Sequence, residues 1–215
     1  MNKISLLLAA TAFAVPAAHA DVAITEWMYS GGSGEFIEFT NLGASAVDFT
    51  GWSYDDDSRT PGVLDLSAFG LVAAGESVII TEIDAATFRL DWSLDASVRI
   101  IDLYENNIGR SDEINLFDGS GSLIDRLTYG DNTIGGPRTQ NASGNAMNFA
   151  ALGANDVTQW TLSAVGDAEG SYASLSGAIG NPGMSAFAAP VPEADTYAMF
   201  LAGLGLLGAV VRRRA

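Results

Sequence analysis

The chain has 215 residues, with 26 acidic and 10 basic side chains, one histidine, no cysteine and a formal net charge of −16. The lack of cysteine excludes disulfides, thiolate catalysis and zinc sites of the cysteine type. Between residues 21 and 190 there are 6 arginines and 24 acids, a net charge of −18. This charge argues against nucleic acid as a partner, because that affinity depends on cationic side chains that release counterions.

The first 20 residues have the three regions of a secretory signal peptide. Lys3 precedes an apolar run of 12 residues, 4–15, and Ala18 and Ala20 form an A-x-A cleavage site. A membrane-spanning helix would need about 17 apolar residues or more. We therefore expect cleavage after Ala20, which also removes His19 and leaves the mature chain without histidine.

The segment 34–56 is the stretch around which we expect the domain to fold. Residues 35–40 are mostly β-branched, aromatic or aliphatic, residues 41–45 are typical of a turn, and residues 47–49 alternate again before Trp52. This pattern predicts two strands joined into a hairpin. Ile37 and Phe39 would share one face, as would Val47 and Phe49, so that the hairpin covers a second sheet.

Further elements follow from the same kinds of signal. The Asp-Gly turn at residues 118–121 lies between two alternating runs and is the best hairpin signal in the chain. One short helix is expected over residues 84–90, with Asp84 as its N-cap. Residues 131–154 are rich in Gly, Asn and Thr and predict a loop or an irregular section. The expected strands cover residues 22–27, 35–40, 47–49, 78–81, 98–103, 113–117, 123–129 and, as the last one, 159–162.

Two sequence signatures resemble the lamin-tail domain family. The first is EFIEFTNLG followed by VDFTGWSYDDDS, and the second is SDEINLFDGSGSLIDRLTYG. Phe36 stands where the family usually has Trp, and the closing G-N-P-G of many bacterial members is matched at residues 180–183. The resemblance extends with gaps from residue 21 to about residue 187. It implies an all-β, immunoglobulin-like β-sandwich domain over residues 21–189.

Residues 190–215 resemble the PEP-CTERM sorting signal of Gram-negative bacteria, which exosortases process. The segment combines a motif at Val191, Pro192, Glu193 and Ala194 with an apolar stretch at 196–211 and a basic end at Arg212, Arg213 and Arg214. Ala194 replaces the second proline of the motif. The apolar stretch of 16 residues would make a transmembrane helix about 24 Å long, short for a bilayer core of about 30 Å. The arginines place the C-terminus in the cytoplasm.

Asp55, Asp56 and Asp57 are the one candidate metal site, with Asp65, Asp112 or Glu113 as further ligands. Calcium prefers several carboxylate oxygens, but the spacing does not match the D-x-D-x-D-G loop. A solvated acidic turn is the favoured interpretation. Glu38 is explained as well by a structural carboxylate bonded to backbone amides as by an acid catalyst.

No catalytic motif stands out in the mature chain. A serine hydrolase would lack its histidine base. A glycosidase needs two carboxylates at a suitable distance, but with so many acids in the chain some pair will always meet that requirement. The four tryptophans, 27, 52, 92 and 160, are better explained as core than as a sugar platform. The sequence therefore favours a non-enzymatic exported surface or matrix protein without a cofactor. Its partners would be signal peptidase, an exosortase and an exopolysaccharide or another surface protein. The alternative is an extracellular calcium-dependent binding module or a hydrolase with an unrecognised site.

Overall fold

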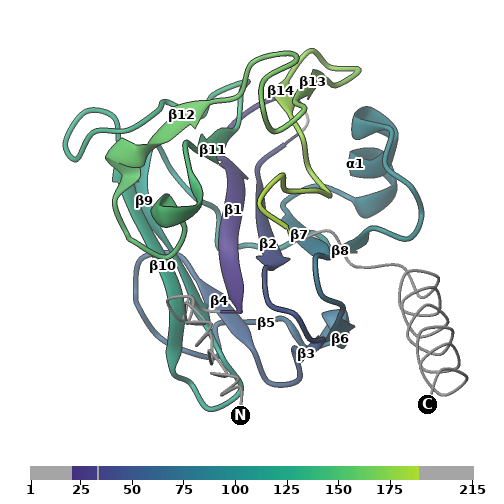
Figure 1. Cartoon of the computed structure of the whole chain (residues 1–215), viewed down its shortest axis with the longest axis vertical. Coiled ribbons are helices and arrows are strands. Elements are labelled where there is room, and N and C mark those ends of the chain that lie inside the picture. The colour runs from purple at the N-terminus through teal and green to yellow at the C-terminus, as the bar shows by residue number, and fades with distance from the viewer. Residues whose placement is uncertain (1–20, 33, 189–215) are drawn as a thin grey trace, which may run out of the picture.

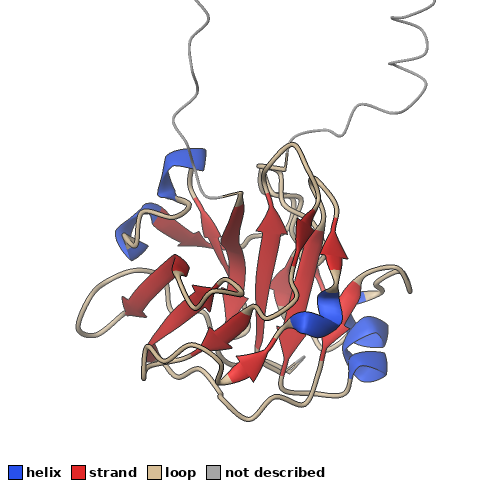
Figure 2. Ribbon diagram, turned by 90° about the horizontal axis from the view of Figure 1, so that it is seen from below, coloured by secondary structure: helices blue, strands red, loops and turns tan. Residues whose placement is uncertain are grey.

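The structure is a computed structural model that describes residues 21–32 and 34–188. Its regular elements are mainly strands, most of which belong to two sheets, with short helices at the periphery (Figure 2). The all-β sandwich predicted from the sequence is confirmed. The predicted signal peptide, sorting motif and helix at 196–211 lie outside the described residues.

The larger sheet has six strands in the order β12-β11-β1-β2-β7-β8 (Figure 1). All neighbours are antiparallel except β7 and β8, which run parallel. β1 and β2 therefore lie in the middle of this sheet, and every residue of both strands is buried. The strands are β1 (Val22–Met28), β2 (Phe36–Asn41), β7 (Ser77–Thr81), β8 (Arg99–Ile101), β11 (Gly144–Ala146) and β12 (Trp160–Leu162).

The smaller sheet has four strands in the order β10-β9-β4-β5, and two strand pairs stand apart from it, β3 with β6 and β13 with β14. Its strands are β4 (Ser53–Asp55), β5 (Leu64–Asp65), β9 (Ser111–Phe117) and β10 (Leu123–Gly130). The separate pairs are β3 (Val47–Asp48), β6 (Leu71–Val72), β13 (Tyr172–Ala173) and β14 (Ile179–Gly180). The described helices are α1 (Ala85–Trp92) and the 3₁₀ turns η1 (Ser67–Phe69), η2 (Phe149–Ala151) and η3 (Val157–Gln159).

The predicted hairpin in segment 34–56 is wrong. β2 pairs with β1 and β7, whereas β3 pairs with β6 and β4 pairs with β9 and β5. The side chain of Asn41 donates to the carbonyls of Ser45 and Val72, at 2.8 and 2.9 Å, and so fixes the exit from β2 towards the β3/β6 pair. The segment carries the chain from one sheet to the other. The predicted faces are correct, because Ile37, Phe39 and Phe49 belong to one buried apolar cluster. Val47 packs against the same cluster.

Two local predictions are confirmed. The carboxylate of Asp84 accepts from the backbone N–H of Thr87 at 2.9 Å and caps α1, which continues two residues beyond the prediction to Trp92. β9 and β10 form the predicted hairpin, and Asp118 in its turn accepts from the N–H groups of Ser120 and Ser122. Short-range side-chain signals therefore identified both elements.

Residues 131–154 are not a loop throughout, because β11 lies within them and pairs with both β1 and β12. Gly144 faces the ring of Trp27, and a Cβ atom at this position would lie 2.3 Å from Cζ3 of that ring. A strand with any larger residue could not approach Trp27 so closely. The strand at β12 is not the last one either, since β13 and β14 follow it.

The main core lies between the two sheets. The Trp27 ring lies 5.1 Å from both the Tyr129 and Trp160 rings, and Trp52 stacks on Phe49 at 4.5 Å. A second apolar cluster lies beneath α1, on the outer face of the six-stranded sheet, and contains Trp92. All four tryptophans are buried. They form the core, as the sequence favoured, and not a sugar platform.

Candidate functional site

Two carboxylates lie side by side in the middle of the six-stranded sheet. Glu26 of β1 is directly opposite Glu38 of β2, beside an irregularity in the strand register at Ile24. Their side chains are 1% and 0% exposed. Ile37 and Phe39, the neighbours of Glu38 along β2, point into the main core, so Glu38 points to the outer face of the sheet.

Hydroxyl groups and one backbone amide surround Glu38. Its Oε1 atom accepts from the hydroxyls of Thr25 and Thr40, at 2.6 and 3.2 Å. Its Oε2 atom accepts from the backbone N–H of Gly183 at 2.6 Å, across 145 positions of the sequence. These contacts are those of a structural carboxylate, one of the two explanations that the sequence left open.

Glu26 has a similar environment, in which one of its two carboxylate oxygens is hydrogen-bonded. Its Oε1 atom accepts from the backbone N–H of Asn181 at 2.8 Å and from the hydroxyl of Ser143. Its Oε2 atom is buried and has no hydrogen-bond partner among the described residues. Ser143 is within 2.5 Å of the Ser163 hydroxyl. A buried polar layer therefore extends from the carboxylate pair across β11 to the end of β12.

Burial governs the ionisation of this pair. Burial raises the pKa of Glu38 to about 7. Burial also raises the pKa of Glu26 well above its usual value, and the negative charge of Glu38 raises it further. The ion pairs within residues 21–32 and 34–188 involve Glu76, Glu113 and Asp131, and neither Glu26 nor Glu38 takes part in one. The pair is therefore easiest to bury when it carries protons.

Two more buried acids join separate parts of the fold. Glu35 accepts from the Tyr104 hydroxyl at 2.5 Å and from the N–H of Ile108 at 2.8 Å, and burial raises its pKa to about 7. Asp125 of β10 accepts from the N–H of Ile24 in β1 at 2.8 Å, and burial raises its pKa to about 6. The contact between Asp125 and Ile24 ties the edge of one sheet to the other.

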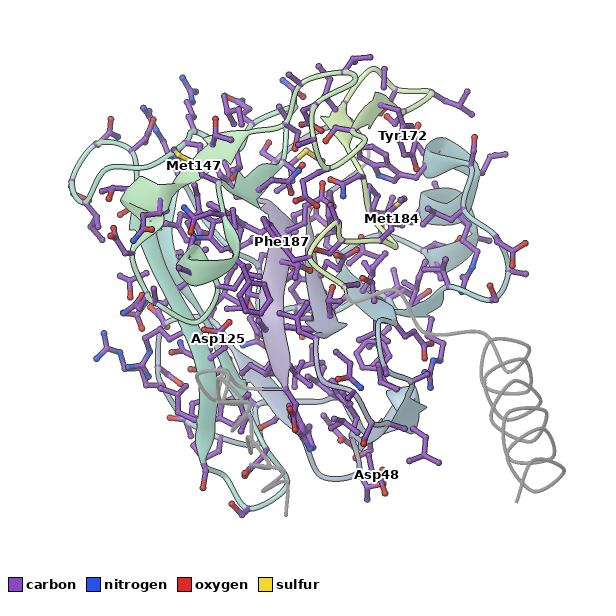
Figure 3. The ribbon with its side chains drawn as sticks, viewed as in Figure 1. Asp48, Asp125, Met147, Tyr172, Met184 and Phe187 are labelled. Atoms are coloured by element: carbon purple, nitrogen blue, oxygen red, sulfur yellow. The ribbon has the colours of Figure 1, made fainter. Side chains whose placement is uncertain are left out.

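Two grooves flank the chain after β14. One, with a volume of about 350 Å³, lies beside β11 and β12 and is lined by Met147, Thr161, Glu169 and Phe187, among others. The second, of about 300 Å³, lies between Glu76 and Met184. Figure 3 shows Met184 and Phe187 over the six-stranded sheet, with Met147 towards β12. The carboxylates of Glu26 and Glu38 line neither groove and are closed off from any substrate.

The acidic run 55–57 is not a uniformly solvated turn. Asp55 is 1% exposed, and its carboxylate accepts from the Ser58 hydroxyl, at 2.9 and 3.0 Å, and from the N–H of Thr60 at 3.1 Å. Asp57 is exposed and Asp56 is half-buried. The predicted solvation is therefore wrong for Asp55, which lies at the buried end of β4.

The further acids proposed as ligands have partners of their own. Asp65 accepts from the Ser67 hydroxyl at 2.6 Å, and Glu113 is bound by the guanidinium of Arg59. Burial raises the pKa of Asp112, and the charges of Asp56 and Asp57 add to the rise. Across the part of the chain that the structure describes, no three acidic or histidine side chains are grouped so as to hold a metal ion.

Calcium is expected to leave the stability of the domain unchanged, because the Asp55 oxygens already accept from Ser58 and Thr60. The melting temperatures in millimolar calcium and in EDTA should agree. A site that binds only the folded chain would stabilise it by about 2.7 kcal/mol at a calcium concentration 100 times Kd. A shift of that size, abolished by Asp56→Asn with Asp57→Asn, would establish the run as a calcium site.

Comparison with known families gives two matches. The Lamin Tail Domain family matches residues 15–131, and the PEP-CTERM protein-sorting motif matches residues 190–214. The first match ends directly after β10, so that β11 to β14 lie beyond it. No curated protein and no solved structure matches the chain. Within residues 21–32 and 34–188, no helix is long and apolar enough to span a membrane.

Proposed function

Because the chain belongs to the lamin tail domain family and carries a PEP-CTERM sorting motif, we propose that it is a non-catalytic surface or extracellular-matrix protein, delivered by an exosortase. The motif implies export and a membrane-anchored stage before processing. The lamin-tail sandwich then serves as a structural or interaction module. An exopolysaccharide or another surface protein is the class of partner that we propose for it.

The observation that carries this proposal is the order of the two matches. The described fold reaches residue 188, and the sorting motif match begins at residue 190. One sandwich is thus followed by the processing signal after a single intervening residue. Cleavage between residues 191 and 194 would release the whole described domain without the apolar segment that follows it.

The chemistry of the described residues supports a non-catalytic role. Both matched families are non-catalytic modules. The acids with strongly raised pKa values, such as Glu26 and Glu38, are buried and accept hydrogen bonds from the protein itself. A general acid needs to reach the proton acceptor on its substrate, and these side chains reach only protein groups.

Processing in cells tests the proposal. In a host with a working exosortase, mass spectrometry of released material should find a chain that ends near residues 191–194. Replacing Pro192 and Glu193 with alanine should keep the chain in the membrane fraction, while Pro61→Ala, in an exposed turn, should be processed normally. A wild-type chain that still ends in Arg212-Arg213-Arg214-Ala215, and is found only in the inner membrane, would contradict the proposal.

A further inference from the structure

The segment 171–187, here called the C-terminal strap, crosses the outer face of the six-stranded sheet (Figure 1). It contains β13 and β14 and ends three residues before the sorting motif match. The two buried carboxylates hold it directly. Glu26 accepts from the N–H of Asn181 and Glu38 from the N–H of Gly183, at 2.8 and 2.6 Å.

Other hydrogen bonds hold the strap at its edges. The N–H of Ser143 donates to the carbonyl of Ile179 at 2.9 Å, which joins β14 to the residues before β11. From α1, Asp91 accepts from the N–H of Ser176 at 2.7 Å, and the carbonyl of Trp92 accepts from the Tyr172 hydroxyl at 2.7 Å. These contacts would be exchanged for contacts with water if the strap detached.

The strap buries less apolar surface than β1 and β2, in which every residue is buried. Its buried apolar side chains are Ala178 and Pro182, and Tyr172 and Phe187 are partly buried, whereas Leu175 and Met184 are 73% and 56% exposed. Segments with few buried apolar contacts open at a lower free energy than the core. Opening of the strap alone should therefore need less free energy than opening of the sheets.

Negative groups predominate around the carboxylate pair. Glu169 and Tyr172 interact electrostatically with Glu26, and burial followed by the charges of Glu26 and Glu38 raises the pKa of Tyr172 to about 12. Beside the second groove, the positive charge of Arg99 is offset by its ion pair with Glu76. The N–H groups of Asn181 and Gly183 lower the pKa values of Glu26 and Glu38, but burial is the larger effect on both. Detachment would hydrate the two carboxyls and lower their pKa values, so the docked strap binds more protons than the free one. The titratable or charged groups near the strap are Glu26, Glu38, Glu76, Asp91, Arg99, Asp167, Glu169 and Tyr172.

We propose that Glu26 and Glu38 form a proton-dependent latch for the C-terminal strap. With protons on the pair, the strap stays docked on β1 and β2. When the pair loses its protons, two buried negative charges face each other and the strap detaches. Residues 171–187 would then add up to about 55 Å of extended chain between the sandwich and the sorting motif. This effect on the reach of the motif rests on the proposed function, whereas the latch itself does not.

Hydrogen exchange of the full chain in detergent tests the latch. After correction for intrinsic exchange, protection of peptides from residues 171–187 should fall about tenfold or more between pH 5.5 and 8.5. Because the stability of the whole domain also falls over this range, peptides from β9 and β10 should lose some protection, but clearly less than the strap. Equal protection of the strap at both pH values would overturn the proposal, and so would a loss in β9 and β10 as large as that in the strap, which indicates global unfolding.

Matched variants separate the latch from general effects. Glu26→Gln and Glu38→Gln, alone or combined, should remove the pH dependence of strap exchange, because an amide does not ionise. Glu35→Gln changes a buried acid that accepts hydrogen bonds from Tyr104 and Ile108, outside the strap, and the pH dependence should persist. A persistent pH dependence in the double Gln variant would overturn the latch.

A steric variant tests the docking geometry without changing a charge. A Cβ atom on Gly180 would lie 2.6 Å from Glu26 Oε1, so Gly180→Ala should expose the strap to exchange even at pH 5.5 while β9 and β10 stay protected. Protection of the strap equal to wild type would overturn the docked geometry. Exchange is measured without exosortase, so a failure of tail processing in cells would contradict the proposed function and not the latch.

Discussion

Trp52→Ala is expected to lower the free energy of unfolding by about 3 to 5 kcal/mol, the range for an aromatic side chain deleted from a core. Trp52 is 8% exposed and stacks on Phe49 with the ring centroids 4.5 Å apart. The backbone N–H of Trp52 donates to the carbonyl of Phe49, and its carbonyl accepts from the N–H of Leu66. The residue thus lies where the chain enters the smaller sheet, and the cavity would open beside β4.

Urea unfolding followed by circular dichroism measures this loss. Leu90→Ala is the matched control, since this side chain on α1 is 70% exposed and its removal should change stability by about 0.5 kcal/mol or less. If Trp52→Ala unfolds at the wild-type urea concentration, Trp52 is not part of the core and becomes a candidate for ligand binding.

The second large effect is a loss of stability as pH rises from about 4.5 towards 7. Burial raises the pKa of Glu38 from 4.5 to about 7, that of Glu35 likewise, and that of Asp125 from 3.8 to about 6. Between the unfolded and folded pKa values the native chain binds more protons than the unfolded chain, so its stability falls with rising pH. The protonated acids contribute fully below their unfolded pKa values, and this contribution is lost above the folded values.

The magnitude for Glu38 alone is about 3 kcal/mol, since one pKa unit corresponds to about 1.4 kcal/mol. Surface aspartates such as Asp118, whose hydrogen bonds to Ser120 and Ser122 lower its pKa, act in the opposite direction below about pH 4. Thermal unfolding should therefore show a higher melting temperature near pH 5 than near pH 8. Glu38→Gln should reduce this difference, and a melting temperature that rises towards pH 8 would show that these acids are ionised at little cost.

The sequence predicted elements whose signals lie within a few residues of each other. The alternation in β9 and β10, and the N-cap at Asp84, needed no distant contact to be recognised. β11 was missed because its residues, Gly144, Asn145 and Ala146, are poor strand formers. Its pairing depends on the fit of Gly144 against Trp27, 117 positions apart in sequence, which no local pattern contains.

The candidate site was predicted only in part. Glu38 lies in the first lamin-tail signature, which made it a candidate, whereas Glu26 lies in the strand-forming run VAITEWM, outside both signatures. That they are opposite each other depends on the pairing of β1 with β2, while the sequence pattern suggested β3 as the partner of β2. Their contacts with Asn181 and Gly183 span 155 and 145 positions. Hydrophobic periodicity carries no information about contacts over such distances.

The central place of β1 has a consequence for how the chain folds during export. β1 is the first strand of the described chain, and it pairs on one side with β2 and on the other with β11, where Trp27 is opposite Gly144. A chain that crosses a membrane from its N-terminus exposes this second edge until residue 144 has followed. Contacts of such long range form slowly. Completion of the sandwich therefore waits until about two thirds of the chain has been translocated.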